Sequence, residues 1–153
     1  MKTTLIIFGI VVLISVLILL FFGSSDETKS ELGNISDVGK HLDSLMKSSN
    51  EYGLLIIEVQ GTENFIQFTG SKNGVQLDHP LITDRQKELE SSFKDVANHL
   101  ALTVIENKGS DGSTFLDVDL KGNSSEIAII VIKFMERFFK INTNSRLVFK
   151  YDY

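Results

Sequence analysis

The sequence predicts an α+β protein: an N-terminal transmembrane helix, then one domain with a mainly antiparallel sheet covered by helices. Three observations predict it. An uncharged apolar run at residues 5–22 precedes a polar stretch. Beyond it, short alternating runs are joined by Gly-containing turns, as in β-hairpins. Longer runs between the hairpins carry one apolar stripe at helical spacing. Hairpins interleaved with helices indicate an antiparallel sheet with helices packed on it, in the order α-βββ-α-ββ-α-(β).

The apolar run at residues 5–22, LIIFGIVVLISVLILLFF, has the length of a membrane span. A helix of this length reaches about 27 Å, close to the hydrocarbon thickness of a bilayer. A removed signal peptide stays an alternative, because Lys2 gives a positive start and Gly23-Ser24-Ser25 supplies small residues. A buried core helix is the weaker reading, because the run is apolar on every side. We therefore expect a transmembrane signal-anchor over residues 1–22.

The charges around this run predict its orientation and the division of the chain. The α-amino group and Lys2 precede it, and acidic residues dominate just after it. The positive-inside rule then places the N-terminus inside and the domain outside a bacterial cell membrane, in the periplasm or another extracytoplasmic space. Residues 23–33, GSSDETKSELG, lack periodicity and predict a polar linker. The α+β domain is expected over residues 34–153.

The first half of the domain predicts a helix followed by a three-stranded meander. Apolar residues from Ile35 to Met46 fall on one helical stripe, with Asn34 or Ser36 as N-cap. The strands are expected at 54–60, 65–69 and 75–78. An Asn-Gly pair at residues 73–74 is a strong cue for a hairpin turn, because both residues tolerate positive φ.

The second half predicts a helix, a hairpin, a further helix and a closing strand. Thr83 and Gln86 have the spacing of a capping box, which favours a helix over 84–101. Alternating runs at 102–107 and 114–120 predict the hairpin. Residues 126–140 are rich in Ile and Val, yet their length and the spacing of Asn123 and Glu126 favour helix. The alternation over 147–153 predicts an edge strand with one packed face.

Two short stretches and the chain's ending carry a resemblance to a known fold. They are FIQFTG at 65–70, GVQLDHP at 74–80 and RFFKINTNSRLVFKY at 137–151. With the element order from residue 35 onward, they resemble the type III secretion chaperone-like fold, which includes YbjN-like bacterial proteins. The resemblance implies a non-catalytic protein-binding module, commonly dimeric, that holds extended partner segments against apolar patches.

Composition and motifs narrow the chemistry. The chain has 20 acidic against 15 basic residues, which argues against nucleic acid as a partner. No cysteine is present, so disulfides and thiol chemistry are excluded. The three histidines, His41, His79 and His99, have no metal-ligand spacing, and His41 and His99 lie off the apolar stripes, where solvated side chains are expected. We predict no catalytic residue, no cofactor and no metal.

The sequence therefore predicts a membrane-anchored module that binds a protein partner or itself as a homodimer. The expected contact is the edge strand, at Leu147, Phe149, Tyr151 and Tyr153, because a free strand edge can pair with a partner's strand. One alternative is a small metal-dependent hydrolase that uses Asp111, Asp117 and Asp119. Another is an immunity or assembly factor for a membrane-associated partner.

Overall fold

The computed structural model describes residues 28–48, 53–71 and 74–153. Its elements, in chain order, are β1 (Lys29–Asn34), the 3-10 helix η1 (Ile35–Asp37), α2 (Val38–Lys47), β2 (Gly53–Val59), β3 (Phe65–Ser71), β4 (Gly74–Pro80), α3 (Asp84–Glu88), α4 (Glu90–His99), β5 (Ile105–Lys108), β6 (Thr114–Leu120), α5 (Ser124–Phe138) and β7 (Arg146–Asp152). The described chain is thus α+β, with helices between groups of strands.

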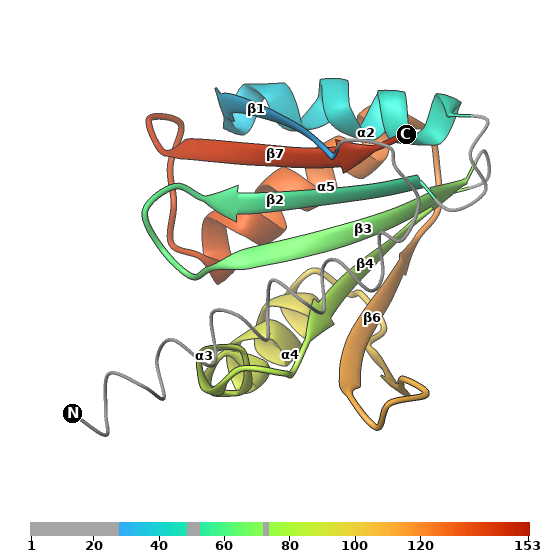
Figure 1. Cartoon of the computed structure of the whole chain (residues 1–153), viewed down its shortest axis with the longest axis vertical. Coiled ribbons are helices and arrows are strands. Elements are labelled where there is room, and N and C mark those ends of the chain that lie inside the picture. Colours follow the sequence, from blue (N-terminus) through green and yellow to red (C-terminus); the bar gives the residue numbers. More distant parts are fainter. Residues whose placement is uncertain (1–27, 49–52, 72–73) are drawn as a thin grey trace.

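The strands form one seven-stranded sheet in the order β1-β7-β2-β3-β4-β6-β5 (Figure 1). Every pairing is antiparallel. β2, β3 and β4 form the meander that the sequence predicts, and β5 and β6 form the second hairpin. β4 pairs directly with β6, so the helices α3 and α4 connect two parts of the same sheet.

The fold class predicted from the sequence is corrected in one respect, the transmembrane helix. No helix within residues 28–48, 53–71 and 74–153 is long and apolar enough to cross a membrane. The expected span at residues 5–22 lies outside the described residues. The predictions of a single-pass membrane protein, an inside N-terminus and a domain beyond a bacterial membrane depended on that span, and no helix among the described residues supports them.

The sheet begins earlier than predicted, and this changes the position of β7. Residues 29–33, expected to belong to a linker, form most of β1. β1 pairs with β7 along its whole length, from Lys29 opposite Tyr151 to Asn34 opposite Arg146. β7 also pairs with β2 on its other side. The prediction that 147–153 form an edge strand is therefore wrong, because β1 occupies that edge.

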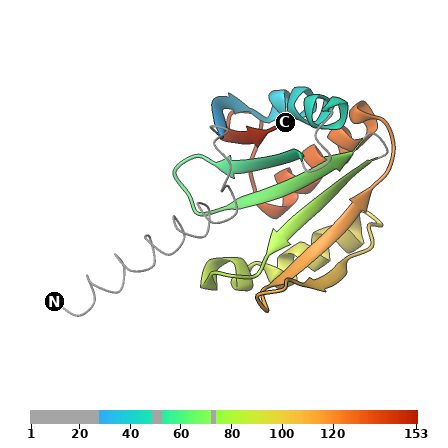
Figure 2. The same cartoon turned by 45° about the vertical axis from the view of Figure 1, so that its right-hand side comes forward.

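All the described helices pack on one face of the sheet (Figure 2). The positions that face them alternate along each strand and are almost fully buried, for example Leu55 and Ile57 in β2 and Leu116 and Val118 in β6. Burial of such side chains contributes roughly 1.5–3 kcal/mol each. Around Phe93 of α4, the rings of Phe134 and Phe138 of α5 pack edge-on at centroid distances of 5.0 and 5.5 Å.

Two predicted capping boxes are confirmed. The Thr83 side chain accepts from the backbone N–H of Gln86, and the Gln86 side chain accepts from that of Thr83. Asn123 and Glu126 do the same at the start of α5, which confirms the choice of helix for this ambiguous run. The helix expected over 84–101 divides at Leu89 into α3 and α4. β5 begins at Ile105 rather than at residue 102.

Candidate functional site

The sheet has one face that no described helix covers, and we call it the open face. A row of directly paired residues crosses it: Ile56 in β2, Gln67 in β3, Asp78 in β4, Asp117 in β6 and Ile105 in β5. These positions alternate with the buried positions on the helix side, because successive strand residues point to opposite faces.

Apolar side chains occupy much of the open face. Leu54 and Ile56 of β2 and Phe65 of β3 are partly exposed at its centre. Near the two edges of the sheet, Leu32 of β1 is 59% exposed and Ile105 of β5 is 43% exposed. Large exposed apolar side chains gathered on one surface are typical of interaction sites.

The remaining side chains make the β4–β6 half of the open face acidic. Asp78 of β4 lies opposite Asp117 of β6, and Asp119 follows two positions along β6 on the same face. At the other half, Lys150 of β7 is engaged by Glu58 of β2, with 2.6 Å between Nζ and Oε1. The acidic half is thus next to the apolar centre.

Asp78 and Asp117 are nearly buried although they lie on the uncovered face. They are 7% and 6% exposed, respectively. The Oδ2 atom of Asp117 accepts hydrogen bonds from the Asn107 and Gln76 side-chain amides. The Oδ1 atoms of both carboxyl groups have no hydrogen-bond partner among the described residues. Asp117 is therefore enclosed, whereas Asp119 on the same face of β6 is exposed.

The three aspartates of the hydrolase alternative are not brought together as a metal site. Asp111, in the β5–β6 turn, accepts hydrogen bonds from the Ser113 backbone N–H at 3.0 Å and its hydroxyl at 2.5 Å. Asp117 accepts hydrogen bonds from the side-chain amides of Asn107 and Gln76, and Asp119 is exposed. Across residues 28–48, 53–71 and 74–153, no group of three or more His, Cys, Asp or Glu side chains is arranged to hold a metal ion.

The predicted partner contact on β7 lies largely inside the protein. Leu147 and Phe149 are fully buried in the core beneath the helices. Tyr151 and Tyr153 are partly buried and stack on each other at a centroid distance of 4.9 Å. Because β1 and β2 pair with β7, the exposed strand edge on which this contact depended does not exist.

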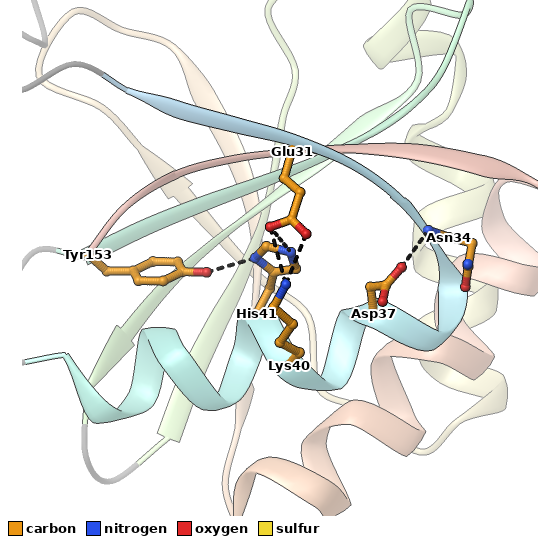
Figure 3. Close-up of polar contacts among 6 residues, drawn as sticks. All are labelled: Glu31, Asn34, Asp37, Lys40, His41 and Tyr153. Atoms are coloured by element: carbon orange, nitrogen blue, oxygen red, sulfur yellow. Dashed lines mark hydrogen bonds and ion pairs between the residues drawn. The ribbon is translucent and has the colours of Figure 1, made fainter.

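Tyr153 instead belongs to a polar cluster with His41, Glu31 and Lys40 (Figure 3). The Tyr153 hydroxyl lies 2.8 Å from His41 Nδ1. The His41 ring stacks on Phe149 at 4.2 Å. Glu31 of β1 lies over the same ring, with 3.7 Å between its Oε2 and His41 Nε2, and its Oε1 is 2.9 Å from Lys40 Nζ. These contacts tie β1 and β7 to α2.

Burial favours the neutral forms of two members of this cluster, His41 and Tyr153. Burial lowers the pKa of His41, although Glu31 opposes the shift. Burial also raises the pKa of the Tyr153 hydroxyl above its usual range. His41 is 2% exposed, so the prediction of a solvated side chain is wrong. A neutral, enclosed histidine that orients a terminal tyrosine serves as a structural clamp.

His79 is a second buried histidine with a structural role. It is fully buried in β4, its Nε2 lies 3.1 Å from the carbonyl oxygen of Gln86, and its ring stacks on Phe93. Burial lowers its pKa, so the neutral ring is favoured. It links β4 to α3, and this linkage has no signature in the local sequence around LDHP.

Comparisons with known proteins find no matching family model, no matching curated protein and no matching solved structure. The candidate site therefore rests on this chain's own geometry. That geometry favours the open face, where apolar side chains and an acidic group lie together on an uncovered surface.

Proposed function

We propose that the domain is a non-catalytic protein-binding module that takes its partner on the open face. The observation that carries this proposal is the arrangement of the layers: the described helices pack on one side of a seven-stranded sheet, and the other side presents Leu54, Ile56 and Phe65. Covering partly exposed apolar side chains yields about 25 cal/mol for each Å² removed from water. A partner is the natural cover for such a surface.

The chemistry of the open face indicates the chemistry of the partner. Next to the apolar centre lies the exposed Asp119, while Lys150 is already paired with Glu58. Complementary charge guides encounter and register between proteins. We therefore expect a partner segment that combines apolar side chains with lysine or arginine. A nucleic acid does not fit, because its phosphates would face this acidic half.

A protein-binding role is also what the sequence's resemblance to secretion chaperone-like proteins implies. That resemblance includes the expected element order α-βββ-α-ββ-α, whereas the structure has two helices, α3 and α4, between β4 and β5. A likeness of fold supports a function only by association. In this chain, the apolar side chains of the open face give the protein-binding proposal a physical basis.

Photo-crosslinking in the cells that produce the protein tests this function. A photoreactive phenylalanine analogue is placed at Ile56, at the centre of the open face, in the full chain. The matched control carries it at Ile129, which is 55% exposed on α5, on the helix-covered side. We expect a discrete adduct from position 56 and none from position 129. An adduct of twice the chain mass would identify the partner as a second copy.

Charge reversal distinguishes specific binding at the open face from non-specific crosslinking. In the position-56 background, Asp119→Lys should abolish the adduct, because it places a positive charge in the acidic half. Glu63→Lys, at an exposed position in the β2–β3 turn, makes the same change away from the open face and should preserve the adduct. Equal yields from positions 56 and 129, or equal effects of the two charge reversals, would refute the proposal.

A further inference from the structure

The carboxyl groups of Asp78 and Asp117 are buried opposite each other, and no described positive charge offsets their mutual repulsion. The two residues are direct cross-strand partners in β4 and β6. Like charges directly opposite each other in a sheet are destabilising, and burial adds the cost of removing them from water. Each residue retains less than one tenth of its exposure. Some positive charge is needed to make the arrangement stable.

No described side chain supplies that charge. The open-face neighbours are Gln67 of β3, Gln76 of β4, Asn107 of β5 and the flanking residues of β6. Asp119 is the charged member of this set within the described chain, and it is also negative. The amides of Gln76 and Asn107 donate to Oδ2 of Asp117, which leaves both Oδ1 atoms without a donor.

A metal ion or a partner's ammonium group cannot reach these atoms in the described arrangement. Each Oδ1 atom exposes less than 1 Å². A cation with ligands of its own would have to displace neighbouring side chains, such as the amides of Gln76 and Asn107, to make contact. A proton needs no such displacement. One proton between the carboxyl groups makes one of them a hydrogen-bond donor to the other and removes one of the two like charges.

We propose that Asp78 and Asp117 share one proton, and that loss of this proton weakens the pairing of β4 with β6. Consistent with this, burial, the charge of Asp117 and a hydrogen bond to it raise the pKa of Asp78 to about 8. At pH 7 a group with that pKa is protonated in a ratio of about ten to one. The open face therefore changes charge just above neutral pH.

The direction of the stability change follows from proton linkage. Between the ordinary aspartate pKa of 3.8 and about 8, the folded protein holds a proton that the unfolded chain has released. Folding is then favoured at the lower pH, and the stabilisation is lost as pH rises toward 8. For one linked proton, the unfolding equilibrium constant rises by at most about tenfold for each pH unit in this window. Above it, the contribution is constant.

Chemical unfolding of the full chain at a series of pH values tests the pair. Asp78→Asn places a permanent amide donor where the shared proton would lie. The ratio of unfolding constants, wild type over D78N, should rise as pH increases from about 5 to 8 and then level. His41 and His79 are present in both proteins, so their titrations largely cancel in this ratio. Asp119→Asn, on the same face of β6 but exposed, is the matched control and should keep the wild-type slope.

A constant ratio across this pH range would overturn the shared proton, as would an equal loss of slope in D119N. Should D78N fail to fold, carbon-13 NMR of the aspartate carboxyl groups in the wild-type full chain decides the matter. We expect one carboxyl titration far above the ordinary aspartate range. Titration of every aspartate within that range would refute the proposal.

Discussion

Replacing Gly70 with alanine should force α2 away from the sheet. Gly70 lies in β3, and a Cβ built on it would be 2.6 Å from Cγ of Leu45 and 2.9 Å from its Cδ2. Carbon atoms pack best at about 3.5–4.0 Å, so Leu45 would have to retreat by about 1 Å. Leu45 is fully buried in α2, so it cannot turn away from the new methyl group into solvent. The added methyl group must therefore displace the helix.

The expected cost is about 1–3 kcal/mol, the usual range for forcing extra volume into a packed core. A matched control is Gly39→Ala in α2, where the new Cβ would meet Ala128 Cβ at an ordinary 3.5 Å. That change should stabilise the protein by about 0.5–1 kcal/mol, because alanine favours helix. The same substitution thus has opposite signs at two contacts of α2, one with β3 and one with α5.

A double-mutant cycle measured by urea unfolding identifies the cause. Leu45→Ala alone should cost about 2–5 kcal/mol through the cavity that it leaves. In the double variant the methyl group at residue 70 enters that space, so the combined cost should fall below the sum of the single costs by at least about 1 kcal/mol. Additive costs, or a Gly70→Ala variant as stable as the wild type, would show that α2 does not rest on the β3 backbone.

Two further predictions concern the C-terminal strand. Tyr153→Phe removes the hydroxyl that lies 2.8 Å from His41 Nδ1 and should lower the free energy of unfolding in urea by about 0.5–1.5 kcal/mol. Tyr151→Phe is the control. An equal loss of stability in both variants would show that the contact with His41 does not stabilise the protein. Because β1 and β2 flank β7, amides from Leu147 to Tyr151 should exchange hydrogen as slowly as those of β2. Exchange as fast as in β5 would contradict the position of β7 inside the sheet.

The elements that could be predicted from sequence are those with local signals. The capping spacings at Thr83 and Asn123 identify helix starts because both partners lie within one turn of the chain. β1 has no such signal: KSELGN is mostly polar, and its strand conformation depends on hydrogen bonds to β7, more than a hundred residues away. An edge strand with few buried side chains cannot be recognised from periodicity alone.

The same limit explains the errors at individual side chains. His41 is expected off the apolar stripe of its helix, yet it lies on the buried face of α2 with Val38 and Leu45. Phe149, Tyr153 and Glu31 close over it from β7 and β1. Asp117 alternates correctly with the buried residues of β6, yet its cross-strand partner is another aspartate. Alternation predicts which face a residue occupies, but the identity of its neighbour depends on strand order, which local sequence does not specify.

The register of β1 against β7 also decides how the domain responds to mechanical load. Lys29, at the start of β1, lies opposite Tyr151, near the end of β7. Tension between these two points pulls across the ladder rather than along it, so the hydrogen-bonded pairs break in succession from that end. Such peeling needs far less force than shearing the whole strand pair at once. Stretching by the two ends would thus release the outermost strand while the remaining six-stranded core stays closed.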